Sequence, residues 1–581
     1  MKYWFFIFAL IAISCSKTDT KTAENFTTKF EKSKGTETAT YLETIAFYKK
    51  LAAAYPQITI QEIGETDSGY PLHLILFNTD KNFNINQLKN STKNIIFINN
   101  GIHPGESDGI DASMLLLRNL VQSPEKIKKL KSIILAIIPV YNVGGALNRN
   151  SYSRVNQNGP KEYGFRGNAR NYDLNRDFIK ADTKNAQSFA KIFTSLNPDV
   201  FIDTHVSNGA DYQYSITHLF TQHNKLGNDL GTFIEYKMKP AIVNSLHLKN
   251  ILITPYVNVC GKTPENGFSQ FFDSPRYSTG YTTLFNTLGL MVETHMLKPY
   301  KIRVEQTYSL LNSVIKFTIK NGTKIKELRK KAVQNILKNK TYPINYQLDK
   351  SNFTVFQFKG FEGKIIPSKV TTGKRLFYDE TKPYTKPIPY YNQFKPTKYI
   401  NIPKAYILKN GWWRVLNRLK ENHINYTVFE KDTTINVVVQ HIKSFKTNPK
   451  VFEGHYMHYQ TETTQTNQKV KFFKNDIYIP VNQSGARYLF ETLEGSATDS
   501  FFNWNYFDTI LQQKEGYSPY VFEDIAEQCL KENPTLKKAL KSKIKSDTAF
   551  ANNPKAQLDF VYKNSPYYEP AHLKLPIYKV Y

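Results

Sequence analysis

The stretch that decides the fold is Asn94-Ile95-Ile96-Phe97-Ile98, an apolar run that ends shortly before His103-Pro104-Gly105-Glu106. A second run, Val200-Phe201-Ile202-Asp203-Thr204-His205, ends on a histidine. Near-continuous apolar runs of this length are typical of strands buried on both faces of a parallel sheet. Imidazole and carboxylate groups bind zinc, and a set of three protein ligands leaves a position open, as catalytic zinc sites do. The predicted ligands of one zinc ion are His103, Glu106 and His205.

Helix-like and strand-like patterns alternate through the first half of the chain. Tyr41–Tyr55 has helical spacing, Ile133–Val140 is a further apolar strand, and Leu288–Val292 is a late buried strand that ends at Glu293. This alternation predicts an α/β fold, in which helices cover both faces of a mostly parallel mixed sheet. Ligands of such folds collect at the carboxyl ends of the strands, where Glu293 and the predicted zinc ligands stand.

The N-terminus has the pattern of an export signal. A charged start, an apolar core over Tyr3–Ile13 and a small residue before Cys15 predict a signal rather than a membrane-spanning helix. The pattern resembles a bacterial lipoprotein signal, in which Cys15 would carry the lipid. Ala12 stands where leucine is usual, so an ordinary cleaved signal with a chance cysteine is the alternative. The expected location is the bacterial cell envelope, with the exported chain lipid-anchored in the periplasm or at the outer membrane.

The 581 residues are enough for more than one domain. A basic, helix-prone stretch over Val304–Lys340 is expected to close the domain that carries the site, and short alternating segments follow it. The predicted organisation is a signal over 1–15, a flexible polar tether over 16–40, a catalytic domain over 41–340, and an accessory α+β region of unknown role over 341–581.

Composition argues against two other classes of protein. The formal net charge is +28, but the basic residues are spread along the chain without a compact motif, so no nucleic-acid partner is expected. Beyond Cys15 only Cys260 and Cys529 remain, which is too few for a disulfide framework or a thiolate zinc site.

The order of these elements resembles the carboxypeptidase A-like family of zinc metallocarboxypeptidases. The likeness runs from about Tyr41 to about Leu297, and His103, Glu106 and His205 match the zinc ligands of that family. The arginine that the family usually places between the first two ligands is absent, and His103-Pro104-Gly105-Glu106-Ser107 is similar to the cytosolic carboxypeptidase branch. The resemblance implies a zinc exopeptidase-like fold with one Zn²⁺, and it leaves open the subsites built on the missing arginine.

Tyr172-Asp173-Leu174-Asn175-Arg176-Asp177 is a second motif. The planar guanidinium of arginine binds a carboxylate through two hydrogen bonds, and asparagine adds a neutral donor. The resemblance implies that Asn175 and Arg176 hold the terminal carboxylate of the substrate. It also implies that Asp173 orients the first zinc histidine.

The resemblance assigns the remaining catalytic roles. Glu293 matches the general base. An arginine downstream of Tyr141-Asn142-Val143-Gly144-Gly145 is expected to polarise the scissile carbonyl. Arg154 fits the spacing best, Arg149 is the next choice, and Arg166 and Arg170 stay open.

A further motif, Asp273–Tyr281, stands where the family lines the pocket for the substrate side chain. Tyr277 matches the mobile tyrosine of that pocket. Arg276 is expected to favour acidic terminal residues, and a turn with surface aromatic residues is the alternative interpretation.

The predicted function is a zinc metallocarboxypeptidase that hydrolyses the C-terminal bond of peptides, with zinc and Glu293 activating the water. Its partner would be a peptide with a free C-terminal carboxylate. The alternatives are a zinc amidase acting on cell-wall peptides, and a non-catalytic, envelope-anchored peptide-binding protein with the same fold.

Overall fold

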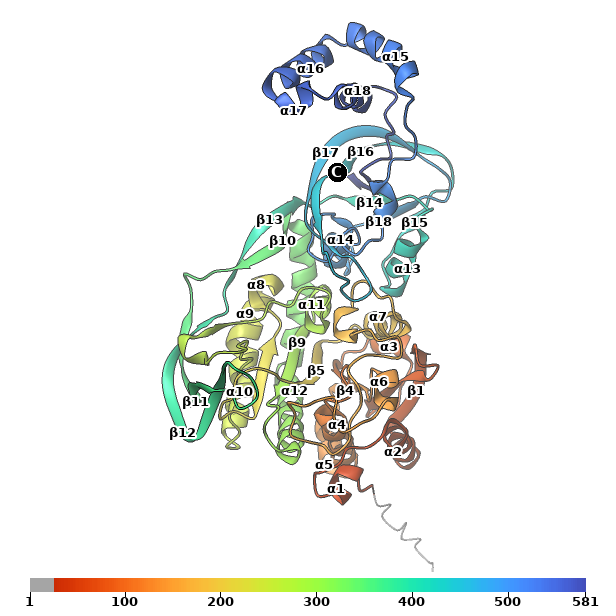
Figure 1. The fold of residues 1–581 in the computed structure, drawn as a ribbon. Coiled ribbons are helices and arrows are strands. Elements are labelled where there is room, and N and C mark those ends of the chain that lie inside the picture. The colour runs from red at the N-terminus through yellow and green to blue at the C-terminus, as the bar shows by residue number, and fades with distance from the viewer. Residues whose placement is uncertain (1–25) are drawn as a thin grey trace, which may run out of the picture.

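The computed structural model describes residues 26–581, so the predicted export signal, Cys15 and the first part of the predicted tether lie outside the described residues. An eight-stranded sheet forms the centre of the first half of the chain (Figure 1). Its strands, in spatial order, are β1 (Ile58–Glu65), β2 (Pro71–Asn78), β4 (Ile133–Ile138), β3 (Asn94–Asn99), β5 (Val200–Val206), β9 (Leu288–Thr294), β6 (Ile216–Phe220) and β7 (Ile253–Pro255).

Parallel pairing dominates the middle of this sheet. β4, β3, β5 and β9 are neighbours in that order and run parallel, whereas β1, β2 and β4 pair antiparallel at one edge and β6 runs antiparallel to β9. The predicted mostly parallel mixed sheet is therefore confirmed. The sequence patterns do not predict β6 and β7, which are short and lie in a long stretch of mixed polarity.

Four long helices match the helical spacing in the sequence: α2 (Tyr41–Ala54), α4 (Asp108–Val121), α7 (Lys184–Leu196) and α12 (Tyr300–Lys338). Among residues 26–581 no helix is long and apolar enough to cross a membrane. The remaining α-helices of the first half are α1 (Lys29–Lys32), α3 (Ile85–Leu88), α5 (Pro124–Lys129), α6 (Val143–Leu147), α8 (His223–Leu226), α9 (Asn228–Phe233), α10 (Lys239–His247) and α11 (Ser278–Thr283).

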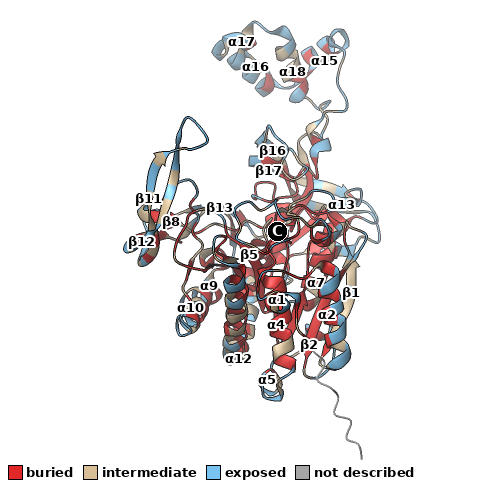
Figure 2. Cartoon of the chain, turned by 60° about the horizontal axis from the view of Figure 1, so that its bottom comes forward, coloured by how far each residue is buried: buried red, intermediate tan, exposed pale blue. Residues whose placement is uncertain are grey.

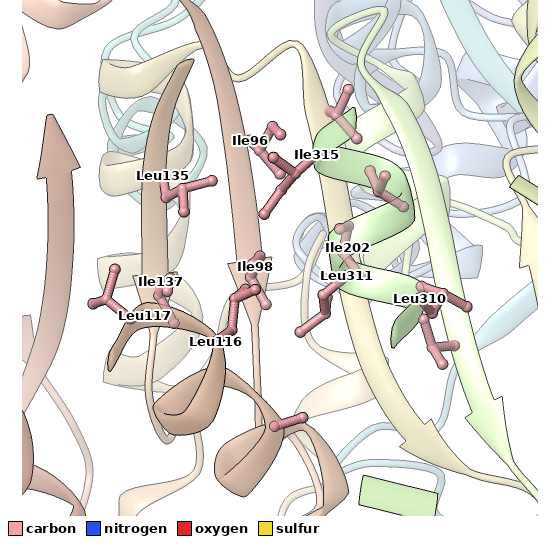
Figure 3. Close-up of a cluster of buried hydrophobic side chains, with 14 of the residues drawn as sticks. Ile96, Ile98, Leu116, Leu117, Leu135, Ile137, Ile202, Leu310, Leu311 and Ile315 are labelled. Carbon is pink, nitrogen blue, oxygen red and sulfur yellow. The ribbon is translucent and has the colours of Figure 1, made fainter. Parts of the chain in front are cut away.

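Side-chain alternation along the strands builds a separate core on each face of the sheet. On one face, Ile96 and Ile98 of β3 pack with leucines of α4 and α12, as Figure 3 shows. On the other face, Phe97 of β3 stacks on Phe189 of α7, with ring centroids 5.5 Å apart. Helices thus cover both faces, as the apolar runs predict.

Residues 26–40 are packed against the domain, so the flexible tether predicted for 16–40 is wrong over this part. Phe26 and Phe30 are buried in the first core. Glu31 forms an ion pair with Arg118 of α4 at 2.6 Å, and it also closes a capping box with Thr28 at the start of α1. The prediction rests on the polar composition of the segment and does not take account of Phe26 and Phe30.

The region after α12 is an α+β assembly, in which the strands of its largest sheet pair antiparallel. A six-stranded sheet runs in the order β15-β18-β14-β19-β16-β17, and the four helices α15 to α18 form a separate group at the top of Figure 1. The strands of the whole region after α12 are β10 (Thr341–Leu348), β11 (Thr354–Pro367), β12 (Lys374–Tyr391), β13 (Phe394–Asn401), β14 (Ala405–Leu408), β15 (Thr427–Val428), β16 (Thr433–Thr447), β17 (His458–Phe472), β18 (Ile477–Pro480) and β19 (Lys574–Val580). Its helices are α13 (Trp413–Glu421), α14 (Ala486–Leu493), α15 (Pro519–Glu532), α16 (Pro534–Ser546), α17 (Thr548–Ala551) and α18 (Pro554–Lys563).

The two halves share one apolar core. The cluster that contains Phe97 and α7 continues through α11 into β14, α13 and α14. Strand β8 (Phe268–Ser269) of the first half also pairs with β12 of the second. Figure 2 shows buried residues running without interruption through this junction, whereas the helices α15 to α18 lie apart from it.

Removal of the Phe97 ring tests the central role of this second core. We expect Phe97→Ala to lower the free energy of unfolding by about 3–5 kcal/mol, because it leaves a cavity against Phe189. Chemical denaturation followed by circular dichroism measures the change. Leu42→Ala on α2 is the control, since Leu42 is 61% exposed, and equal destabilisation by both substitutions would contradict the assignment.

Candidate metal centre and substrate pocket

Three predicted ligands meet at the carboxyl ends of β3 and β5. One ligand atom from each of His103, Glu106 and His205 lies within 4.8 Å of the others, and all three residues are buried. His103 and Glu106 stand in the turn between β3 and α4, and His205 is near the end of β5. Ser107 is the N-cap residue of α4, although its side chain makes no capping hydrogen bond.

Carboxylates fix the orientation of both imidazoles. His103 Nε2 lies 2.9 Å from Asp173 Oδ1, and His205 Nε2 lies 2.8 Å from Asp203 Oδ2. The Nδ1 atoms therefore face Glu106, at 3.1 Å from its Oε1 and 3.0 Å from its Oε2. This is the arrangement that orients histidine ligands in metal sites, where the second ring nitrogen bonds a carboxylate.

The neighbouring charges shift the pKa values of Glu106 and His205 in opposite directions. Burial alone would raise the pKa of Glu106, but Arg154 and the two imidazoles outweigh it and hold the pKa well below its usual range. Burial alone would lower the pKa of His205, but Asp203 and Glu106 raise it well above the usual value. These neighbours favour the ionised form of Glu106, and the Arg154 guanidinium, 2.9 Å away, is a cationic partner for it.

The donor set fits a zinc ion. Two imidazole nitrogens and one carboxylate converge, and the other nitrogen of each imidazole bonds an aspartate. Zinc accepts this set of ligands and keeps a further position for water or substrate in catalytic sites. The cluster can therefore hold one metal ion, as the sequence predicts.

A pocket of about 210 Å³ opens over the cluster, and Glu293 lies in its wall. Glu293 of β9 is the register partner of His205 on the parallel strand β5. Burial, with the neighbouring acids Glu106 and Asp203 adding to it, raises the pKa of Glu293 to about 8. A carboxyl group with such a pKa exchanges protons readily near neutral pH, as a general base must.

The carboxylate-binding motif reaches the same pocket. Asn175 and Arg176 both line it, from the short 3₁₀ turn Leu174–Arg176. Asn175 Oδ1 accepts a hydrogen bond from the Ser278 backbone N–H at 3.3 Å, so its amide nitrogen is the group left to donate. The Arg176 guanidinium lies over the Tyr277 ring, 4.6 Å from its centroid. The predicted roles are thus geometrically possible.

The four candidate arginines separate clearly. Arg154 lies outside the lining of the pocket and forms an ion pair with Glu106 at 2.9 Å. Arg166 lines the pocket, with one guanidinium nitrogen 3.8 Å from Glu106 and another 2.8 Å from Asp173. Arg149 donates to the backbone carbonyls of Ala39 and Glu162, and Arg170 to that of Asp182. The geometry therefore favours Arg166 over Arg154 for contact with a substrate.

Tyr277 lines the pocket as predicted, but Arg276 does not. The Arg276 guanidinium forms an ion pair with Asp499 of the accessory region at 2.8 Å. Its charge is therefore satisfied away from the pocket, and the expected preference for acidic terminal residues has no basis in this arginine. Ser278, which follows Tyr277, donates its hydroxyl hydrogen to Asp203.

Sequence reasoning misses two residues of this centre. Asp203 precedes His205 by two positions on β5, so alternation places both on one sheet face, and this spacing could have revealed it. Glu453 accepts a hydrogen bond from the Asp173 backbone N–H at 2.9 Å. No sequence signal points to Glu453, because it lies 280 positions away along the chain.

Residues 44–205 match the family model described as zinc carboxypeptidase, and this segment contains all three ligands of the cluster. A search of curated proteins found no match. The match and the geometry together define a zinc metallopeptidase centre. Within that class, the matched segment is similar to the zinc carboxypeptidases.

Several solved structures are similar at low identity. A metallo-carboxypeptidase from Burkholderia cenocepacia is 15% identical, with a TM-score of 0.36, over 47% of this chain and 68% of that one. Carboxypeptidase A from Helicoverpa armigera is 13% identical, with a TM-score of 0.35, over 48% of this chain and 73% of that one. Similarity at this level is too low to support a shared substrate.

The hydrogen bond that His205 Nε2 donates to Asp203 gives a prediction for metal affinity. We expect Asp203→Asn to weaken zinc binding by about 10–100-fold, because the amide no longer fixes the imidazole as an anion does. Competition with a chromogenic chelator measures the affinity. Glu293→Gln is the matched control, since Glu293 is no ligand, and unchanged affinity in Asp203→Asn would contradict the assigned role.

Proposed function

We propose that this protein removes the C-terminal residue of peptides by hydrolysis. The proposal rests on one observation: a metal-binding cluster, a candidate general base and a candidate carboxylate-binding pair line the same pocket. The metal cluster, the half-buried Glu293 and the pair Asn175 and Arg176 all line it. The match of residues 44–205 to zinc carboxypeptidases supports the same reaction class.

Asn175 and Arg176 would hold the free carboxylate of the substrate. The Arg176 guanidinium is held by the Asn175 carbonyl at 2.9 Å and by the Tyr277 ring, so it is already oriented when the substrate arrives. A bidentate arginine–carboxylate pair gives both affinity and geometric specificity. This anchor would place the last peptide bond over the metal cluster.

Glu293 would act as the proton carrier. It accepts a proton from the attacking water as the new C–O bond forms, and passes it to the leaving amine as the C–N bond breaks. His103, Glu106 and His205 would hold the zinc ion, which when bound supplies Lewis acidity and lowers the pKa of water. The reaction consumes one water and yields a shortened peptide and a free amino acid.

Arg166 would stabilise the charge that develops on the scissile carbonyl oxygen. It borders the pocket beside Glu106, and Asp173 fixes its guanidinium through two hydrogen bonds, at 3.1 and 2.8 Å. Donors that are oriented before the reaction are the most effective at stabilising such charge. This proposal replaces Arg154 with Arg166 in that role.

Apolar side chains share the remaining wall of the pocket with Asn208, Tyr256 and Asn258. This mixed wall favours an uncharged terminal residue, because the apolar side chains offer a charged one no partner in exchange for its water. The apolar residues are Val206, Leu219, Phe271 and Met291.

The base assignment gives the test of this proposal. We expect Glu293→Gln to lower turnover of free-ended peptides by at least about 100-fold, because the amide cannot accept the proton. Zinc content should stay at the wild-type level, as measured by atomic absorption. Arg166→Ala should lower kcat in the same assay with zinc retained.

A substrate panel separates the alternatives. Free-ended peptides with apolar, acidic and basic termini are compared with murein peptides, with and without chelator. Preferred cleavage of murein peptides would favour a cell-wall amidase. Binding of peptides without cleavage by zinc-loaded protein would favour a non-catalytic binding protein.

A further inference from the structure

The accessory region covers the outer side of the segment that carries the substrate anchor. His455 Nε2 lies 2.6 Å from Asp182 Oδ2, and the Tyr506 hydroxyl donates to the Lys180 carbonyl. Gly454 lies so close to Tyr172 that an added Cβ would come within 2.7 Å of its hydroxyl oxygen. The segment that contains Asn175 and Arg176 is therefore held between the central sheet and the accessory region.

One of these contacts reaches the anchor turn itself. Glu453 Oε2 accepts a hydrogen bond of 2.9 Å from the backbone N–H of Asp173, the N-cap residue of the 3₁₀ turn. Asp173 Oδ1 in turn accepts from the Asn175 backbone N–H at 2.9 Å. Glu453 is thus bonded to the residue that starts the turn, and it lies outside the lining of the pocket.

Glu453 lies at the tip of a short hairpin that has its own hydrogen-bonded pairing. Phe452 and His455 pair as an isolated β-bridge, and between them Glu453 takes a positive φ of 50°. Such a conformation is uncommon for a residue with a side chain and persists where the surroundings require it. The Phe452 ring is stacked near Trp504, with centroids 6.1 Å apart. The tip is therefore anchored in the accessory region.

The residue next to Tyr277, which also lines the pocket, is held from the same region. Asp499 is fully buried, accepts from the Arg276 side chain at 2.8 Å and from its backbone N–H at 3.1 Å, and also accepts from the Trp504 indole at 3.1 Å. Arg276 directly precedes Tyr277, whose ring stacks on Arg176. Both partners of that stacked pair are thus tied to the accessory region.

We infer that the accessory region completes the exopeptidase site, with Glu453 as the positioning residue that holds the 173–176 turn for capture of the substrate carboxylate. The inference rests on the proposed function. Glu453 does not contact the substrate, and it acts through the backbone of the turn. The region assigned no role from sequence would then be required for recognition of the free C-terminus.

Substitutions at Glu453 test this inference in the full chain. We expect Glu453→Ala to raise KM for a free-ended peptide about ten-fold, the size expected for loss of one charge-assisted hydrogen bond, with kcat little changed. Glu453→Gln keeps an acceptor oxygen and should restore a KM near the wild-type value. Glu453→Gly is the second variant, because glycine tolerates the positive φ and also removes the acceptor. Glu462→Ala is the matched control, since Glu462 is an exposed residue of the same region that pairs with Lys443 at 3.5 Å.

Two further results separate the possible failures. If Glu453 acts through the anchor, adding Glu453→Ala to Arg176→Ala should raise KM no further, because coupled residues are not additive. A wild-type KM in both Glu453→Ala and Glu453→Gly, or a thermal midpoint and zinc content that fall together with activity, would overturn the inference. If Arg176→Ala itself leaves KM unchanged, the proposed function fails instead.

Discussion

The carboxylate of Glu106 is bonded on both sides by imidazole nitrogens, and the rest of the site depends on this buried triad. Asp173 and Asp203 bond the opposite nitrogens and hold both rings with Nδ1 toward Glu106. Without these acids the imidazoles would lose the partners that fix their orientation. The central fold has to deliver five side chains from three separate segments of the chain to one point.

The parallel sheet meets this requirement by register. β5 and β9 place His205 beside Glu293, and β3 ends where the turn to α4 carries His103. His205 and Asp203 share a sheet face with Phe201, which belongs to the core that continues into the accessory region. The catalytic face of the sheet is therefore also the face on which the second half of the chain is built.

The sequence predicts those features that depend on residues close together along the chain, and it does not predict those that depend on contacts between distant segments. Apolar runs and the spacing from His103 to Glu106 are local, so the central parallel strands, the ligands and the position of Glu293 at a strand end could be predicted, whereas the short strands β6 and β7 could not. The choice between Arg154 and Arg166 depends on how a long loop folds back over Glu106, which spacing along the chain does not determine. Glu453 could not be found at all, because its partner is a backbone N–H of a distant turn.

The most direct test of the central claim compares one peptide in two forms, a free C-terminal acid and the corresponding C-terminal amide. Zinc-loaded protein is incubated with each, and the products are followed by mass spectrometry. The account predicts that the free acid loses its last residue and that the amide stays intact, because Asn175 and Arg176 then have no carboxylate to hold. Equal cleavage of both forms, or cleavage at internal bonds, would contradict it.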